Sequence, residues 1–253
     1  MSGAPYVEGH GLLAGMTAVV TAAAGTGIGF ATARRFVEEG ARVVLSDAHE
    51  RRLAEAAEAL GMPGVACDVT HEAQVRRLFA EAADALGGGI DVVVNNAGLG
   101  GTVNLVDMTD EQWGKVLDVT LTGTFRCTRA ALVHMQERGG GVIVNNASVL
   151  GWRAQAGQAH YAAAKAGVMA LTRCAAVEAA PFGVRVNAVS PSLAMHPFLS
   201  KVISEDDLAR LEAEEVFGRS AEVWEVANVI VFLASGYSSY MTGEVVSVSS
   251  QHP

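Results

Sequence analysis

The chain has 253 residues, of which 50% are hydrophobic and 18% are charged. This length and composition predict one folded domain with a sizeable core, and they exclude a disordered chain. The formal net charge of −9 argues against nonspecific binding to nucleic acid or to an anionic membrane.

Short apolar runs alternate along the chain with longer helical patterns, which is typical of a parallel sheet covered on both faces. The predicted strands are Met16–Thr21, Arg42–Ser46, Gly64–Cys67, Ile90–Asn95, Val142–Ala147, Arg185–Val189 and Glu244–Val248. The predicted helices are Ile28–Glu39, His49–Leu60, His71–Leu86, Asp110–Arg138, Gln158–Ala180 and Glu222–Ala234. Residues 192–218 break the alternation, and we expect them to form a substrate-binding lid with short helices. The sequence therefore predicts a single α/β domain over residues 1–253, with a doubly wound sheet of seven parallel strands.

Three glycines lie in the turn between the first predicted strand and the first predicted helix: Gly25, Gly27 and Gly29. Missing β-carbons let the backbone approach a pyrophosphate, and free amides at the helix start, near Ile28, would face its negative charge. A glycine triplet alone is weak evidence, because ordinary tight turns use the same residues. Its place after a strand makes nucleotide binding the favoured interpretation.

Asp47 ends the second predicted strand, where a carboxylate can accept hydrogen bonds from an adenosine ribose and repel a 2′-phosphate. Asp47 could also cap the helix that follows it, and one aspartate can serve both roles. Arg51 and Arg52 leave some room for a phosphorylated ribose, but they lie one turn into the helix. The residues favour NAD over NADP as the cofactor.

The segment 148–165 contains Ser148, Tyr161 and Lys165, with the last two on one face of a predicted helix. An ammonium beside a phenol stabilises the phenolate. Lowering a phenol pKa from about 10 to near neutral takes about 4 kcal/mol, which Lys165 and a positively charged nicotinamide could supply together. Ser148 could then bind the same substrate oxygen. These residues predict proton transfer to or from an alcohol or carbonyl oxygen.

Together these features resemble the short-chain dehydrogenase/reductase family over Leu13 to Val248. The resemblance rests on the glycine turn, Asp47, CDVT at Cys67–Thr70, NNAG at Asn95–Gly98, Ser148, Tyr161, Lys165 and RVNAVSP at Arg185–Pro191. It implies a Rossmann-type fold, Tyr161 as the acid/base, and Lys165 as a ribose ligand that lowers the tyrosine pKa. It also implies cofactor contacts from Asp68, Val69, Asn95, Ala97, Gly98 and Pro191. In similar proteins the helix at 158–180 builds a dimer within a tetramer, so we expect a homo-oligomer.

Four departures from the family pattern stand out. Ala22 occupies the place of a glycine, in a turn that is one residue longer, so Gly25 must take over that glycine's role or the turn changes shape. Thr120 replaces the asparagine of the catalytic tetrad, which is thought to hold a kinked helix and a proton-relaying water; we expect retained activity with an altered relay. His196 replaces a threonine near the nicotinamide amide. The chain ends in SSQHP instead of a glycine-rich segment.

The substrate side of the site is less specific. Trp152 and Arg153 follow Ser148 on a loop, and Arg153 could bind a carboxylate or phosphate or simply lie at the surface. Met195, His196 and Phe198 fall in the predicted lid, where apolar residues could form a substrate wall or pack in the core. The expected substrate is a secondary alcohol or ketone on a bulky apolar body, and the whole chain resembles bacterial members that act on CoA thioesters in steroid-ring degradation.

Two other functions stay open. One is a 3-oxoacyl thioester reductase of lipid metabolism, and the other is a dinucleotide-binding sensor or scaffold without turnover. The sequence contains no HExxH, GxSxG or Walker-type lysine loop, so it gives no support to a metal site, a serine esterase or NTP hydrolysis. The three scattered cysteines favour buried thiols in a reducing compartment. With no recognisable signal peptide or membrane-spanning run, we expect a cytoplasmic location.

Overall fold

The computed structural model describes residues 5–195 and 205–250. Its main sheet has seven strands in the order β3-β2-β1-β4-β5-β6-β9, and all neighbouring pairs are parallel. The strands are β1 (Thr17–Thr21), β2 (Arg42–Asp47), β3 (Gly64–Ala66), β4 (Val92–Asn95), β5 (Gly141–Asn146), β6 (Val184–Pro191) and β9 (Val245–Val248). Each coincides with a predicted strand to within about two residues, so the predicted doubly wound fold is confirmed.

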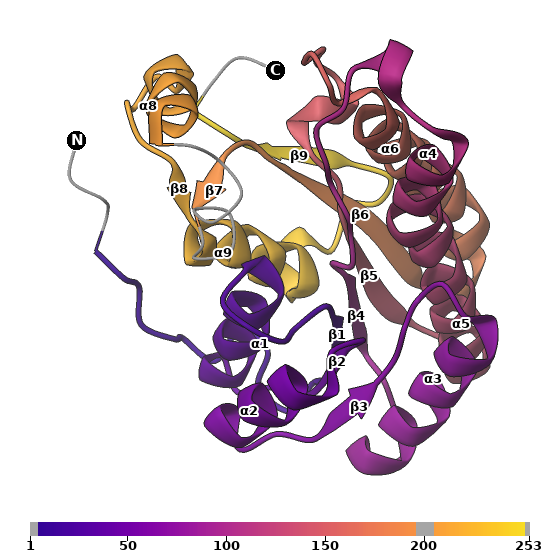
Figure 1. The fold of residues 1–253 in the computed structure, drawn as a ribbon. Coiled ribbons are helices and arrows are strands. Elements are labelled where there is room, and N and C mark those ends of the chain that lie inside the picture. The colour runs from indigo at the N-terminus through magenta and orange to yellow at the C-terminus, as the bar shows by residue number, and fades with distance from the viewer. Residues whose placement is uncertain (1–4, 196–204, 251–253) are drawn as a thin grey trace.

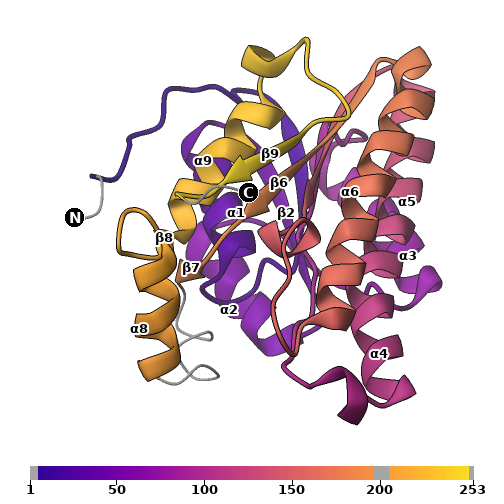
Figure 2. The ribbon, with the colours of Figure 1, turned by 90° about the horizontal axis from the view of Figure 1, so that it is seen from above.

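Helices cover both faces of the sheet (Figures 1 and 2). One face carries α1 (Ile28–Glu38), α2 (Glu50–Leu60) and α9 (Val223–Ala234). The other carries α3 (Glu72–Leu86), α4 (Asp110–Leu117), α5 (Gly123–Arg138) and α6 (Ala159–Ala179). Successive strand residues point to opposite faces, so Val19 packs in the α3–α5–α6 core while Val20 packs in the α1–α2–α9 core. A strand buried on both faces must be apolar throughout, which explains why these runs were recognisable from the sequence.

The predicted helix over 110–138 is interrupted. A π turn, Asp118–Thr122, separates α4 from α5. Inside this turn, Thr120 is fully buried, and its hydroxyl both accepts a hydrogen bond from Leu99 N (3.0 Å) and donates one to Leu99 O (3.2 Å). This long-range contact ties the helix to the loop after β4. The helix is thus interrupted by a π turn at the place where the family resemblance implied a kink, with threonine in place of asparagine.

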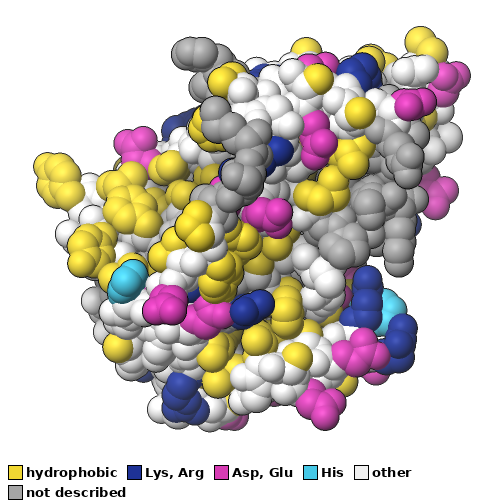
Figure 3. Space-filling view, turned by 90° about the vertical axis from the view of Figure 1, so that its left-hand side faces the viewer, with side chains coloured by type: hydrophobic (Ala, Val, Ile, Leu, Met, Phe, Trp, Pro, Cys, Tyr) yellow, Lys and Arg dark blue, Asp and Glu magenta, His cyan; other side chains and the backbone are white. Residues whose placement is uncertain are grey.

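Among its described residues the predicted lid segment contains one helix, α8 (Glu205–Glu214). The strands β7 (Ala194–Met195) and β8 (Ala221–Glu222), before and after this helix in the chain, form a small parallel sheet. The segment's movement as a lid stays a prediction. Acidic and basic side chains are interspersed among hydrophobic ones on the face that includes α1, α2 and α8 (Figure 3). No single sign of charge dominates that face.

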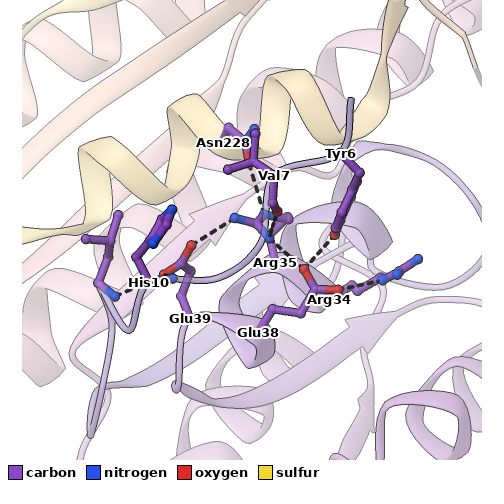
Figure 4. Close-up of polar contacts among 9 residues, drawn as sticks. Tyr6, Val7, His10, Arg34, Arg35, Glu38, Glu39 and Asn228 are labelled. Carbon is purple, nitrogen blue, oxygen red and sulfur yellow. Dashed lines mark hydrogen bonds and ion pairs between the residues drawn. The ribbon is translucent and has the colours of Figure 1, made fainter. Parts of the chain in front are cut away.

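A buried ion pair fastens the N-terminal segment to this face (Figure 4). The Arg35 guanidinium donates to Glu39 (2.8 Å) and to Asn228 of α9 (2.9 Å). The other Glu39 oxygen accepts the backbone amides of His10 (2.9 Å) and Leu12 (3.0 Å). Removing one partner of such a pair would leave an uncompensated buried charge, so the hydrogen bonds from the N-terminal backbone are part of what stabilises it.

The backbone of Ala22 is in a strained conformation. Among the described residues it is the only non-glycine with a positive φ, at +49°. A left-handed conformation costs a non-glycine residue roughly 1–2 kcal/mol. Glycine avoids this cost, but it loses more backbone entropy on folding than alanine does, which offsets part of the stabilisation. We expect Ala22→Gly to raise the free energy of unfolding in urea by about 0.5–1 kcal/mol.

Ala24 provides the matched control, because it lies in the same turn without a positive φ. Ala24→Gly should lower the free energy of unfolding by about 0.5–1 kcal/mol. If both variants lose stability by the same amount, the strain at Ala22 is absent.

Candidate active site

A cavity of about 430 Å³ opens where β1, β4, β5 and β6 end at the same edge of the sheet. The order of the strands reverses between β1 and β4, and ligands of open parallel sheets bind at such switch points. The described residues that line the cavity are Ala22, Ala24, Gly27, Ile28, Gly29, Asn96, Gly98, Gly100, Asn146, Ala147, Ser148, Leu150, Gln155, Gln158, Tyr161, Lys165, Pro191, Ser192, Leu193, Ala194 and Leu211. The structure therefore brings together the predicted glycine turn and the predicted catalytic residues.

The glycine turn has the features that a dinucleotide requires. Gly25 adopts a φ of +98°, and a β-carbon added at Gly25 or Gly27 would meet no atom within 4 Å, so this side of the turn is open. The first turn of α1 has no side-chain cap, which leaves its backbone amides available for an anion. Gly29 has a different purpose: a β-carbon there would collide with the Ala22 carbonyl, because α1 packs directly on the turn.

Asp47 lies at the end of β2, partly buried, and is held by two backbone amides. Its carboxylate accepts from Ala24 N (3.1 Å) and from His49 N (2.9 Å), which orients it beside the glycine turn. Each oxygen retains capacity for a further hydrogen bond. The alternative interpretation, that Asp47 caps α2, is wrong: the cap is His49, whose ring accepts from Arg52 N.

Several other predicted cofactor residues support the site without lining the cavity. The Asp68 carboxylate binds Thr70, and Val69 is buried in the core. Asn95 is buried and donates to Asn145 of β5 (2.9 Å). Ala97 donates its amide to Thr21. Their contacts with a cofactor stay predictions.

The three catalytic candidates meet at one wall of the cavity. Ser148 lies two residues after the end of β5, and its hydroxyl accepts a hydrogen bond from Leu150 N (3.2 Å). Tyr161 and Lys165 lie one turn apart on α6, with the Lys165 ammonium 5.5 Å from the centre of the tyrosine ring. The ammonium donates to the Asn146 carbonyl at 2.6 Å, so its position is fixed from β5.

Burial dominates the proton affinities of this pair. It raises the pKa of Tyr161 to about 12, although the hydrogen bond with Ser148 acts in the opposite direction. Burial also lowers the pKa of Lys165 to about 8. The expected acidification of Tyr161 by Lys165 is therefore not found among the protein's own groups. At neutral pH the phenol is protonated, which suits donation of a proton to an oxygen held between Ser148 and Tyr161.

Two asparagines that the sequence analysis did not single out connect the ends of this site. Asn146 donates from its side chain to Asn96 (2.8 Å), and Asn96 donates in turn to the Ala22 carbonyl (3.1 Å). Within the described part of the chain, Asn146 Oδ1 is a buried acceptor with no hydrogen-bond partner. An asparagine pair ends each of the adjacent strands β4 and β5, and that repetition in the sequence was the available signal.

The remaining substrate candidates are dispersed. Arg153 lines a second cavity next to Ser148. Trp152 is 43% exposed, and Met195 is partly buried in β7; neither is among the described residues that line the two cavities. His196 and Phe198 lie outside the described residues.

The role of Thr120 can be tested by two substitutions. An asparagine side chain has both the acceptor and the donor that bind Leu99, so we expect Thr120→Asn to keep turnover within about threefold or to raise it. Thr120→Val keeps the shape but leaves the partly buried Leu99 amide without its partner, and should destabilise the protein by about 1 kcal/mol. Steady-state turnover and urea unfolding measure the two effects. A large loss of turnover in the asparagine variant would show that the threonine has a role of its own.

Comparisons with known proteins agree with this geometry. Residues 22–250 match the family described as Enoyl-(Acyl carrier protein) reductase. A relative from Mycobacterium tuberculosis, (5R,7aS)-5-hydroxy-7a-methyl-1-oxo-2,3,5,6,7,7a-hexahydro-1H-indene-carboxyl-CoA reductase, is 63% identical over 98% of this chain and 97% of its own. The cis-4-hydroxycyclohexanecarboxylate dehydrogenase of Sinomonas cyclohexanicum is 43% identical over 91% of this chain and 94% of its own.

Among solved structures, a short chain dehydrogenase from Mycobacterium smegmatis superposes with a TM-score of 0.89 at 56% identity, covering 100% of this chain and 99% of that one. The match extends over the sheet, the glycine turn and the wall that carries Ser148, Tyr161 and Lys165. The chain therefore belongs to the short-chain dehydrogenase/reductase family and is an oxidoreductase.

Proposed function

We propose that the protein transfers a hydride between NAD(H) and a secondary alcohol, or its ketone, on a bulky apolar ring, with a CoA thioester of steroid-ring degradation as its substrate class. The observation that carries this proposal is the meeting of Ser148, Tyr161 and Lys165 in the cavity that also contains the open glycine turn. The names of the relatives support the substrate class, because one is a reductase of an indene-carboxyl-CoA and another a dehydrogenase of a hydroxycyclohexane ring.

Each side chain then has a definite task. A nicotinamide dinucleotide, when bound, supplies or accepts the hydride. The amides at the start of α1 hold its diphosphate, and Asp47 accepts hydrogen bonds from its ribose. Ser148 and Tyr161 hold the substrate oxygen, and Tyr161 donates the proton during reduction. Lys165 fixes the position of the cofactor's other ribose, the one that Asp47 does not bind. Leu150, Leu193 and Leu211 provide apolar surface for the ring body.

Absorbance of NADH tests the proposal directly. NAD⁺ is mixed with a panel of cyclic secondary alcohols, and NADH with the matching ketones. We expect turnover of ring substrates. Tight NADH binding with no turnover across the panel would support the sensor instead, and a preference for linear 3-oxoacyl thioesters would support the lipid reductase. Relatives named 3-oxoacyl-[acyl-carrier-protein] reductase are less similar to this chain, at 38% identity for the one from Thermotoga maritima.

The preference for NAD over NADP depends on Asp47. Because its carboxylate is oriented by Ala24 and His49 at the end of β2, it would lie against a 2′-phosphate and repel it. We expect Asp47→Ala to weaken NADH binding about tenfold and to strengthen NADPH binding, as measured by cofactor fluorescence. Asp47→Asn is the control, because it keeps an acceptor but removes the charge. An unchanged preference in both variants would show that another group selects the cofactor.

We also propose a homo-oligomer, a dimer or a tetramer, that pairs through α5 and α6. Large apolar side chains are exposed along these helices and the turn after α6: Phe125 (40%), Val133 (59%), Val177 (76%) and Phe182 (38%). A groove of about 400 Å³ lies between the two helices. Exposed apolar side chains gathered beside a groove are typical of an interface between subunits.

A cytoplasmic location is part of the proposal. Its support is the state of the cysteines, since Cys67, Cys127 and the exposed Cys174 are all free thiols, which a reducing compartment preserves. In the ranges 5–195 and 205–250, no helix is both long enough and apolar enough to cross a membrane.

A further inference from the structure

A second cavity, of about 380 Å³, adjoins the active-site cavity. The two share six lining residues: Ser148, Leu150, Gln155, Ser192, Leu193 and Leu211. Because Ser148 lines both, a molecule whose oxygen is held by Ser148 can extend from the first cavity into the second. The second cavity is formed between the loop after β5 and the helix α8.

The two cavities differ in charge. Among the described residues, Lys165 is the only charged side chain that lines the first cavity. The second is lined by two arginines from opposite walls, Arg153 and Arg210, and by Glu214 and Glu215. An anionic group attached to a substrate in the first cavity would therefore meet guanidinium groups only by extending into the second.

Neither Glu214 nor Glu215 prevents an anionic group from contacting the two arginines. Glu214 is 3.7 Å from Arg210, and both side chains are more than half exposed, so this is a weak surface ion pair that an anion can replace. Glu215 is buried, and its Oε2 accepts a hydrogen bond from the Ser250 hydroxyl at 2.7 Å, which directs that oxygen into the wall. Arginine suits a phosphate better than lysine does, because its planar fork can donate two parallel hydrogen bonds.

We propose that this second cavity binds the pantetheine arm of a thioester substrate, with Arg153 and Arg210 contacting the phosphate groups attached to that arm. This inference rests on the proposed function, because it places the hydroxyl-bearing ring of the same substrate in the first cavity. Of the two roles that the sequence leaves open for Arg153, anion binding or a plain surface position, this proposal adopts the first, and Arg210 on α8 is its partner across the cavity.

Free CoA, 4′-phosphopantetheine and pantetheine are the probes, titrated by calorimetry. The protein is first saturated with NADH, so that the adenosine part of CoA cannot occupy the dinucleotide site. We expect CoA to bind about tenfold more tightly than pantetheine, with a difference that shrinks at high salt. Arg153→Ala and Arg210→Ala should each weaken CoA binding about fivefold or more, and the double variant should bind CoA no better than pantetheine.

Arg76→Ala is the matched control. Arg76 is also an exposed helical arginine in a pair spaced four residues apart, with Glu72 at 3.0 Å, but it lies on α3 and lines neither cavity. It should leave CoA binding unchanged. The thermal unfolding midpoint of each variant shows that it is folded.

Equal affinities for CoA and pantetheine in the wild type, or an unchanged CoA affinity in the double arginine variant, would overturn the inference. If 4′-phosphopantetheine binds as tightly as CoA, the contacted phosphate is the one that CoA shares with carrier-protein thioesters; if only CoA binds tightly, the contacts are to its adenosine phosphates.

A separate experiment tests the proposed function independently of CoA binding. Wild-type protein is assayed with cis-4-hydroxycyclohexanecarboxylate and NAD⁺, a ring alcohol without the arm. Turnover of this alcohol without CoA binding would remove the second-cavity inference and leave the dehydrogenase. CoA binding without turnover of any ring alcohol or its thioester would overturn the dehydrogenase function and leave the second cavity as a CoA-binding site.

Discussion

Tyr161→Phe is expected to lower kcat by about a thousandfold or more, while NADH affinity changes by less than about threefold. Tyr161 is the proposed proton donor in the cavity, and Ser148 by itself can hold the substrate oxygen but has no acidic proton to give at neutral pH. Phenylalanine keeps the ring that lies 5.5 Å from the Lys165 ammonium, so packing is preserved. Steady-state kinetics and NADH fluorescence measure the two quantities.

Tyr237 supplies the control for this substitution. It is 75% exposed and is not among the described residues that line the cavity, so Tyr237→Phe should leave kcat unchanged. If Tyr161→Phe retained more than about a tenth of the wild-type rate, protonation by Tyr161 could not be the step that the geometry indicates.

Lys165→Met is expected to remove most of the activity and at the same time to stabilise the fold. Lys165 is 3% exposed, and burial lowers the pKa of its ammonium to about 8, from 10.5 for an exposed lysine. At pH 7 both the folded and the unfolded chain carry the charge, so the folded protein bears the whole cost of desolvation. That cost corresponds to about 3 kcal/mol, offset by about 1 kcal/mol for the hydrogen bond to Asn146, so the methionine variant should gain about 2 kcal/mol.

The pH dependence of the free energy of unfolding tests whether the pKa of Lys165 is lowered in the folded protein. Between pH 8 and 10.5 the unfolded chain binds more protons at this lysine than the folded one, so its contribution to wild-type stability rises with pH. The raised pKa of Tyr161, about 12, has the reverse effect: between pH 10 and 12 the folded state holds the extra proton, and stability falls. Urea unfolding from pH 7 to 10 should therefore show a rising wild-type curve and a flatter Lys165→Met curve. Parallel curves would mean that the lysine titrates normally in the folded protein.

The fold was predictable from the sequence because its determinants are local. Each strand of the parallel sheet is buried on both faces, so each appears as an apolar run, and every predicted strand is present. The break in the helix at 118–122 is different, because it depends on a contact between Thr120 and Leu99, which lies 21 residues away in the sequence. Only the family resemblance indicated a kink there.

In the candidate site too, some features were predictable from the local sequence and others depend on contacts between distant residues. The residue types and their spacing were enough to place Ser148, Tyr161 and Lys165 together. The direction of the tyrosine pKa was not predictable, because it is set by burial, which depends on the packing of the whole cavity. His49 as the cap of α2 and the pairing of Asn96 with Asn146 also arise from the tertiary arrangement.

The contacts between the N-terminal segment and α1 limit how far the protein can be shortened at its N-terminus. Tyr6 donates to Glu38 (2.6 Å) and stacks edge-on against Trp224, and Glu39 depends on two amides from residues 10 and 12. A version that begins after Leu12 would enclose a carboxylate with two fewer donors beneath α9. Recombinant versions should therefore begin before Tyr6, and a start codon chosen a dozen residues downstream would yield a weaker fold with its catalytic residues intact.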